Sequence, residues 1–157
     1  TMVALILAGK MGSNIASEIG SMRITEQIDA MEIMGVNSAN YLILPKVLGL
    51  VLFMPILVTF CVALGLFGGA GVAQFTDLIT MSDYIYGIQY AFYPFYFTQG
   101  VIKSLFFGFI ISSVSSFYGY YAYGGALAVG RASTHAVVNS SVIMLLADVV
   151  LTKIMLT

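Results

Sequence analysis

Three long apolar segments determine what this chain can fold into, because each is long enough to cross a lipid bilayer. A spanning helix needs about 20 mainly apolar residues, and its backbone must be hydrogen-bonded internally because the hydrocarbon holds no water. The apolar first residues add the tail of another such helix. We therefore predict a single all-α membrane domain over residues 1–157, a polytopic transmembrane helix bundle with membrane-helix segments at residues 1–9, 46–73, 95–117 and 136–157.

The composition favours a membrane protein and excludes several other classes. Only 8% of the residues are charged, whereas a soluble domain carries about 25%. The net charge of −1 provides no basic face for nucleic acid, whose phosphates must be neutralised by cations. Cys61 is the only cysteine, which excludes a disulfide framework and a cysteine-rich metal site. We expect this chain itself to bind no metal and no cofactor.

The distribution of Lys and Arg predicts the orientation of the membrane helices. The connections at residues 10–45 and 118–135 carry or adjoin basic residues, whereas the connection at residues 77–94 carries none. Basic residues favour the cytoplasmic side, so we expect the first and third connections in the cytoplasm and the second outside. A glycine-rich stretch in the third connection predicts a loop leading into the last helix, with Ser133 or Thr134 as its N-cap.

One stretch between the apolar segments concentrates the charge. Residues 17–35 read SEIGSMRITEQIDAMEIMG and hold five of the charged residues of the chain. From Thr25, a suitable N-cap, to Gly35, a suitable stop, apolar and acidic residues each recur at a spacing of three. This pattern predicts a short amphipathic helix outside the membrane with an acidic polar face. The apolar residues are Ile28, Met31 and Met34, and the acidic ones are Glu26, Asp29 and Glu32.

Three interpretations of this helix differ in what its polar face contacts. Adsorption to lipid is disfavoured, because anionic headgroups attract Lys and Arg rather than Asp and Glu. A solvated helix within a loop and a helix that docks on a soluble cytoplasmic partner both fit the pattern, and the periodicity does not choose between them.

A resemblance to a known family covers nearly the whole chain. It begins with GKMGSNIASEIGSMRITEQIDAMEIMGVNSANYLILPKVLG at residues 9–49. It continues with VIKS at residues 101–104, FYGY at residues 117–120, GGALAVGRAST at residues 124–134, and AVVNSS at residues 136–141 followed by Asp148. These segments resemble the MlaE/YrbE permease family, the membrane subunit of ABC lipid transporters associated with MCE proteins. Family members carry a further N-terminal part, and this chain opens TMVALILAGK without an initial Met, so we expect that part to be missing.

The resemblance implies a function and a set of partners. It implies the permease subunit of an ATP-driven ABC transporter that moves phospholipid or a related lipid between the bacterial inner membrane and an MCE-type carrier. The implied partners are a second copy of the permease in a homodimer, an MCE-domain protein, and an ABC ATPase subunit that holds ATP and Mg. Residues 16–35 would form the coupling helix, which fits a groove on the ATPase, with the partner-binding residues Glu18, Arg23, Glu26, Gln27, Asp29 and Glu32.

Two charged residues lie well inside the predicted membrane helices. An ionisable side chain at membrane depth costs about 2.5–3.5 kcal/mol on insertion, so each requires an explanation. Lys103 and Asp148 fall at a similar depth, about 12–14 Å below the outer surface at the helical rise of about 1.5 Å per residue. We expect them to face the protein interior and to pair. The pair either fixes the packing of two helices or meets a lipid phosphate in transit.

No enzyme motif is present. The sequence lacks a G-x-S-x-G elbow, an H-E-x-x-H motif and a Walker G-x-x-x-x-G-K-[ST] loop, so we expect a non-catalytic subunit with ATP hydrolysis on a separate polypeptide. His135 has no second ligand at i+3 or i+4 and is expected to be a neutral interfacial residue. Two other functions remain open: a non-transporting membrane scaffold that recruits a cytoplasmic partner, and an ion-coupled secondary transporter that uses Lys103 and Asp148.

Overall fold

The N-terminal end of the chain forms one long helix. The computed structural model describes residues 1–75 and 80–156, and every regular element in these two ranges is helical. Three segments follow one another with right-handed helical backbone angles at their junctions: α1 (Met2–Leu7), the π-helical turn η1 (Ala8–Gly12) and α2 (Ser13–Ile24). The membrane-helix tail expected at residues 1–9 is therefore the first part of a longer helix, and Lys10 lies in its middle rather than at the start of a connection.

The remaining helices confirm the polytopic all-α fold. In chain order they are α3 (Gln27–Ile33), η2 (Ala39–Ile43), α4 (Leu44–Phe75), α5 (Met81–Ala91), α6 (Pro94–Tyr120) and α7 (Ala126–Leu156). Within the described ranges, three helical stretches are long and apolar enough to cross a membrane: Ala39–Phe75, Pro94–Tyr120 and Ala126–Leu156. They contain the predicted segments 46–73 and 95–117 and all but the last residue of 136–157. Thr157, Asp77 and Thr76 lie outside the described residues.

The last helix begins earlier than the sequence predicts. It starts at Ala126 instead of residue 136, and the loop before it is confined to Tyr121–Gly125. Two adjacent glycines make this turn, since Gly124 has a φ of 109° and Gly125 a φ of 85°, values that favour glycine. Hydropathy detects only the part of a helix that lies in lipid, so it missed the first turns of α7.

Ser133 and Thr134 are consequently not helix caps. Both lie inside α7, where the Thr134 hydroxyl donates to the carbonyl of Gly130 at 3.0 Å. The Ser133 hydroxyl lies 2.7 Å from the hydroxyl of Ser13 on α2. The serine therefore joins two packed helices, which is a common use of small polar residues between membrane helices.

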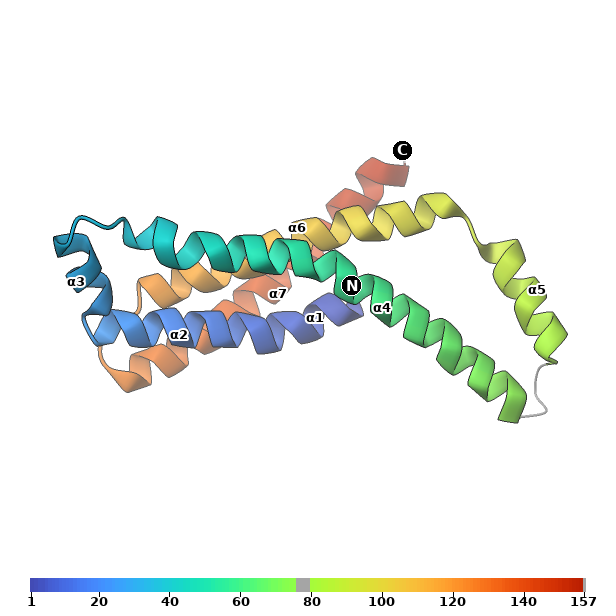
Figure 1. Cartoon of the computed structure of the whole chain (residues 1–157), viewed down its shortest axis with the longest axis horizontal. Helices are drawn as coiled ribbons and strands as arrows, with labels where there is room; N and C mark the ends of the chain where they lie inside the picture. The colour runs from blue at the N-terminus through green and yellow to red at the C-terminus, as the bar shows by residue number, and fades with distance from the viewer. Residues whose placement is uncertain (76–79, 157) are drawn as a thin grey trace.

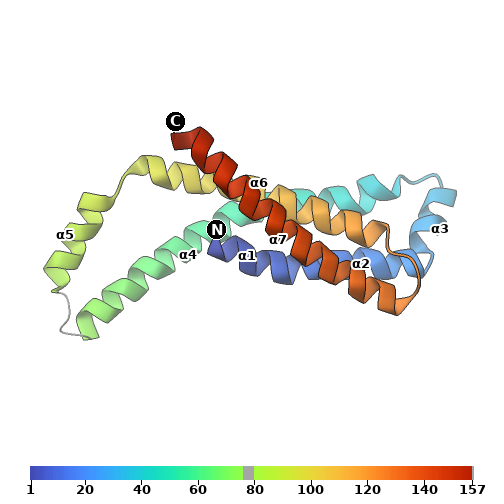
Figure 2. The ribbon, with the colours of Figure 1, turned by 180° about the vertical axis from the view of Figure 1, so that it is seen from behind.

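Small residues let the long helices approach each other closely. A Cβ on Gly119 of α6 would lie 2.8 Å from the backbone oxygen of Ala16 on α2, and one on Gly108 would lie 3.1 Å from the backbone oxygen of Leu50 on α4. Figures 1 and 2 show these helices side by side from opposite directions, with α6 between its neighbours. Close backbone approach at small residues is the usual way in which membrane helices associate.

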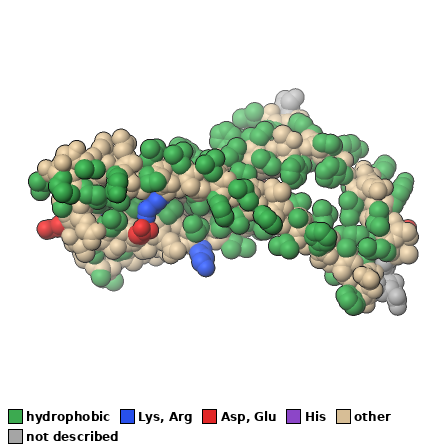
Figure 3. All heavy atoms as spheres, in the orientation of Figure 1, with side chains coloured by type: hydrophobic (Ala, Val, Ile, Leu, Met, Phe, Trp, Pro, Cys, Tyr) green, Lys and Arg blue, Asp and Glu red, His purple; other side chains and the backbone are tan. Residues whose placement is uncertain are grey.

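The two ends of the bundle differ. Figure 1 shows α3 and the loop between α6 and α7 at one end, and α5 at the other. This arrangement agrees with the prediction that the first and third connections share one side of the membrane and the second lies on the opposite side. Much of the face in Figure 3 is covered by hydrophobic side chains with few charges among them. Leu52, Phe60 and Leu64 on α4 are each exposed by more than half, as expected of a surface that contacts lipid.

Candidate functional site

The short helix α3 is separate from α2 because the chain turns sharply between them. Thr25 ends α2, and its hydroxyl donates to the Ser21 carbonyl at 2.8 Å. Glu26 then adopts a left-handed backbone with a φ of 59° and precedes α3 without a side-chain cap bond. The sequence prediction that Thr25 is the N-cap of this helix is therefore wrong. The predicted coupling helix at residues 16–35 is divided by this turn into the end of α2 and the separate helix α3.

Gly35 stops α3 as the sequence predicts. Its φ of 79° places it in the left-handed region. The Val36 amide donates to the Met31 carbonyl at 3.0 Å, and the Gly35 amide donates to the Glu32 carbonyl at 3.0 Å. Glycine tolerates this conformation at a helix C-terminus because it has no Cβ.

One apolar side chain anchors α3 to the bundle. Ile28 is completely buried and packs in a cluster with Ile15, Ile19 and Leu42, which come from α2 and η2. Met34, which the periodicity placed on the same side, is 70% exposed because it lies beyond the last helical residue. The apolar contact of α3 is therefore centred on Ile28.

Arg23 joins three parts of this end of the molecule. It lies at the end of α2, and its Nη1 donates to Oδ1 of Asp29 on α3 at 2.7 Å. Its Nη2 donates to the hydroxyl of Tyr123 in the loop between α6 and α7, and its guanidinium lies 5.5 Å from the ring centre of Tyr120. The Tyr123 hydrogen bond, with the nearby Asp29, raises the pKa of Arg23 above its ordinary value, so the side chain carries its charge at any physiological pH.

Glu32 also points toward the bundle. Its Oε1 accepts a hydrogen bond from the Tyr120 hydroxyl at 2.9 Å and another from the Ser38 hydroxyl at 2.9 Å. These bonds, Tyr120 first and Ser38 second, hold the pKa of the Glu32 carboxyl below its ordinary value. Sequence analysis missed both hydroxyl partners. The run of tyrosines at the end of α6 was the available signal, since a phenol there can donate to a carboxylate.

The six residues predicted to bind a partner thus fall into two groups. Arg23 and Glu32 contact other parts of the chain, and Glu18 lies 2.5 Å from Nζ of Lys46 on α4. Glu26 and Gln27 are exposed, and neither side chain has a partner among the described residues. Asp29 belongs both to the residues that contact the rest of the chain and to the exposed ones, because it forms an ion pair with Arg23 while its side chain is 50% exposed.

The outward side of α3 combines acidic and apolar groups. Ile33 is 87% exposed and Met34 is 70% exposed, and they adjoin the exposed acidic residues of the same helix. We call this region the α3 surface and define it as Glu26, Gln27, Asp29, Ile33 and Met34. Exposed apolar side chains rimmed by charge are typical of a site that contacts another protein.

Changing Glu32 to Gln should remove a pH-dependent part of the attachment of α3. Because the folded-state pKa of Glu32 is depressed below 4.5, the charged carboxyl stabilises the attachment above that pH, and the contribution disappears as the pH falls through the folded-state pKa. We expect α3 amides to exchange hydrogen faster in Glu32→Gln than in the wild type at pH 7, with the two rates converging below pH 4.5. Equal rates at pH 7 would contradict this.

The intramembrane residues Lys103 and Asp148 lie together, as the sequence predicts. Nζ of Lys103 is 3.0 Å from Oδ1 of Asp148, and it also donates to the hydroxyl of Thr152. The Thr1 hydroxyl donates to the other carboxylate oxygen at 3.0 Å. The two charged side chains are 16% and 23% exposed. A pair that is sheltered in this way satisfies the requirement that charges at membrane depth be paired.

A cavity with a mixed polar and apolar lining adjoins this pair. It has a volume of about 230 Å³, and Lys103, Gln99, Ser104 and Tyr96 contribute to its lining. Gln99 and Ser104 are almost fully buried. The cavity therefore places a cation and neutral hydrogen-bonding groups together inside the membrane region.

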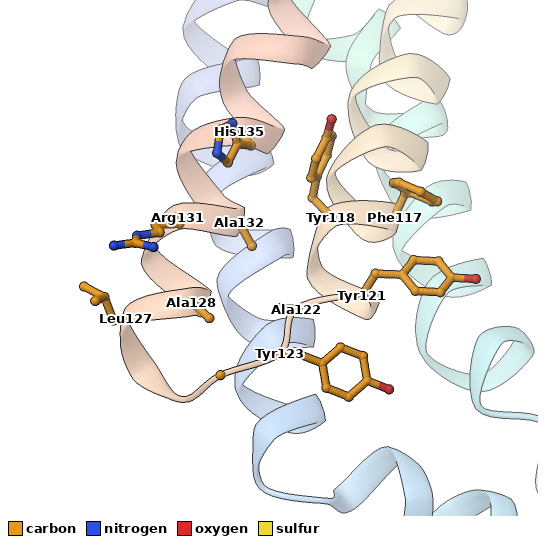
Figure 4. Close-up of a pocket in the computed structure, with 11 residues that line it drawn as sticks. Phe117, Tyr118, Tyr121, Ala122, Tyr123, Leu127, Ala128, Arg131, Ala132 and His135 are labelled. Atoms are coloured by element: carbon orange, nitrogen blue, oxygen red, sulfur yellow. The ribbon is translucent and has the colours of Figure 1, made fainter.

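A larger hollow at the opposite end holds aromatic side chains. It has a volume of about 550 Å³ and lies between the end of α6 and the start of α7 (Figure 4). His135 stacks on Tyr118 with ring centres 6.2 Å apart, and Arg131 also borders the hollow. In residues 1–75 and 80–156 no group of three His, Cys, Asp or Glu residues is arranged to hold a metal ion. The exposed His135 and its aromatic neighbour fit an interfacial position.

Comparison with known proteins identifies the family. The model of the family described as Permease MlaE matches residues 1–154. The chain belongs to the MlaE permease family. Membership confirms the resemblance seen in the sequence.

Relatives of this MlaE chain occur in several groups of organisms. A probable ABC transporter permease protein of Rickettsia bellii is 39% identical over 153 residues, which cover 98% of this chain and 59% of the relative. The protein TRIGALACTOSYLDIACYLGLYCEROL 1, chloroplastic, of Arabidopsis thaliana is 35% identical over 161 residues, which cover 97% of this chain and 43% of the relative. The chain spans about three-fifths of the length of the first relative.

Proposed function

We propose that this chain is the permease subunit of an ATP-driven ABC transporter in a bacterial inner membrane, and that it moves phospholipid to or from an MCE-type carrier. The names of the Rickettsia relatives support an ABC-type permease. ATP and Mg would be bound by a separate ATPase subunit, since the chain has no Walker motif. A second copy of the permease would complete the membrane part of the complex.

The α3 surface is the observation that supports docking of an ATPase at this end of the molecule. A lipid-embedded subunit needs a polar and rigid contact with a soluble motor, and α3 supplies one outside the apolar spans. Contacts of Ile28 and Glu32, and the bond from Arg23 of α2, hold the inward side of α3 on the bundle. A partner can therefore push on the outward side without detaching the helix. Acidic groups beside exposed Ile33 and Met34 fit a partner groove that has a basic rim and an apolar floor.

The cavity beside Lys103 supports a lipid as the transported molecule. A phospholipid phosphate is an anion that an ammonium and a neutral donor such as the Gln99 amide can bind at membrane depth. The Lys103–Asp148 pair is also the specific observation that favours an ion-coupled secondary transporter, because paired charges in a membrane form proton and ion relays. The dependence of transport on ATP or on an ion gradient separates the two functions.

Reversing the charge of the α3 surface should detach the ATPase. We expect the double change Glu26→Lys with Gln27→Lys to reduce the amount of ATP-hydrolysing subunit that co-purifies with the full-length permease at least about tenfold, since unlike charges across an interface would become like charges. The measurement is the ratio of ATPase subunit to permease in detergent, together with ATP hydrolysis by the purified complex.

Asp83→Lys provides the matched control. Asp83 is an exposed acidic residue on α5, at the end of the molecule opposite α3, so replacing an acidic residue by Lys there should leave the ratio unchanged. A wild-type permease that brings down no ATP-hydrolysing subunit would overturn the proposal and favour the scaffold. Lipid transfer from phosphatidylethanolamine vesicles that follows an ion gradient without ATP would instead favour the secondary transporter.

A further inference from the structure

One carboxylate and two hydroxyl groups lie at the corners of a triangle between α3 and α6. Oε1 of Glu32 lies 2.9 Å from the Ser38 hydroxyl and 2.9 Å from the Tyr120 hydroxyl, and the two hydroxyls are 3.1 Å apart. Ser38 is only 2% exposed. The three residues come from α3, from the segment just before η2 and from the last turn of α6. The triangle therefore connects elements that are far apart in the sequence.

A second contact runs in parallel with the triangle. Arg23 holds Asp29 of α3 on one side and Tyr123 of the α6–α7 loop on the other. Its guanidinium also lies over the rings of Tyr120 and Tyr123, at 5.5 and 5.2 Å from their centres. Both contacts end on the same short region, the end of α6 and the loop that leads to α7.

These contacts decide where α3 sits. The helix has seven residues, and a helix of that length is not stable by itself in water, so its position depends on what it touches. The buried Ile28 holds it to α2 and η2. The triangle and Arg23 are the polar contacts that hold it to α6 and to the loop before α7, so a displacement of α3 must either carry α6 with it or break charged hydrogen bonds.

Helix α6 can transmit such a displacement to the helices packed against it. Gly119, one residue before Tyr120, lies against the backbone of α2, and Gly108 lies against the backbone of α4. Tightly packed helices move as rigid elements rather than deforming locally, and coupling between distant sites travels through such elements and the polar groups that join them. A force on the α3 surface thus has a direct route to the membrane helices.

We propose that Arg23, Glu32, Ser38 and Tyr120 form a link that transmits movement of α3 to α6 and α7 during transport. We call these four residues the α3–α6 link. They are positioning residues that do not contact the ATPase, which distinguishes them from the α3 surface. This inference rests on the proposed function, because it assumes that an ATPase drives α3.

The ratio of lipid moved to ATP hydrolysed separates transmission from simple support. A purely structural role would lower complex yield, ATP hydrolysis and transport together. A transmission role leaves the ATPase bound and active while fewer lipids move for each ATP. We therefore suggest measuring all three quantities on the same purified complex in vesicles of phosphatidylethanolamine and phosphatidylglycerol, with fluorescent phospholipid as the probe.

Tyr120→Phe is the sharpest variant, because it removes one hydroxyl and keeps the ring. We expect co-purification of the ATPase and its rate of hydrolysis to stay within about twofold of the wild type, and lipid moved per ATP to fall at least about fivefold. Tyr121→Phe is the matched control. Tyr121 is the next residue, 62% exposed, and its hydroxyl has no partner among the described residues, so this variant should match the wild type.

Two results would overturn the inference. One is an unchanged ratio of lipid to ATP in both Tyr120→Phe and Ser38→Ala, which removes another corner of the triangle. The other is loss of the ATPase from Glu32→Gln while hydrogen exchange shows that α3 is still attached, which would make Glu32 a contact residue instead. If Tyr120→Phe lowers the melting temperature of the complex, Ser38→Ala provides the same test at a different residue. A wild-type complex that hydrolyses no ATP would refute the proposed function instead.

Discussion

Asp148→Asn is expected to lower the free energy of unfolding of this permease by about 3 kcal/mol. The change removes the carboxylate that lies 3.0 Å from Nζ of Lys103 and leaves an unpaired ammonium inside the membrane region. Removing one member of a sheltered pair is more costly than removing both, because the remaining charge loses its partner but stays out of water. The effect is measured by titrating the purified protein with SDS in mixed micelles.

Combining Asp148→Asn with Lys103→Met tests the pair itself. The double variant should be more stable than the sum of the single losses predicts, since neither charge is then left alone. Thr152→Val is the control, because it removes one hydrogen bond from Nζ of Lys103 while keeping the ion pair, and it should cost about 1 kcal/mol. Strict additivity of the two charge changes would show that the pair contributes no coupling to the fold.

Transport separates the two roles that the sequence left open for this pair. If the pair only fixes helix packing, the double variant should move lipid at nearly the wild-type rate once it is folded. If Lys103 binds a phosphate in the adjoining cavity, the double variant should stay folded and still lose transport. The same protein sample therefore yields both the stability and the functional result.

The sequence was sufficient to predict this pair because lipid restricts what a charge can do. Few ionisable residues occur in the spans, and each must find a partner at its own depth. Lys103 and Asp148 fall at the same depth, so their contact followed from helix geometry alone. The apolar spans were equally predictable, since length and hydropathy are properties of a single segment.

Contacts between segments were less predictable. Nothing local in the sequence shows that Glu32 accepts its hydrogen bonds from Tyr120 and Ser38, because these partners are set by how the helices meet. The acidic periodicity of residues 26–32 therefore suggested one uniform polar face, whereas the structure directs Glu32 inward and Glu26 outward. The prediction that Thr25 is an N-cap was wrong for a related reason, since a residue that suits an N-cap also suits the end of the preceding helix.

This division of the acidic residues changes how variants of α3 should be interpreted. A triple change of Glu26, Asp29 and Glu32 to Lys would disturb the α3 surface and the α3–α6 link together, so a loss of binding could arise from either. Separate changes are informative, because the side chains of Glu26 and Gln27 have no hydrogen bond or ion pair among the described residues, while Tyr120 and Ser38 lie behind α3. The structure thus separates binding of a partner from transmission of its movement.

Gly119→Ala is expected to destabilise the protein by about 2–3 kcal/mol and to stop transport. The new Cβ would lie 2.8 Å from the backbone oxygen of Ala16 and 3.1 Å from its Cα, and a helix backbone cannot retreat locally. Helices α2 and α6 must separate, which also displaces the ends that carry Arg23 and Tyr120. The free energy is measured by SDS titration and transport in the reconstituted complex.

Gly100→Ala on the same helix is the control for this last prediction. No atom of a neighbouring element lies within 4 Å of the Cβ that this change would add, so the only expected effect on stability is the better helix propensity of Ala, which favours the folded state by up to about 1 kcal/mol. Gly100 lines the cavity beside Lys103, so this control is compared for stability and not for transport. Both variants add one methyl group to α6. They differ in that the methyl group at residue 119 meets α2, whereas the one at residue 100 does not. If they are equally stable, α2 and α6 do not pack through Gly119, and the route from α3 into the membrane helices must run elsewhere.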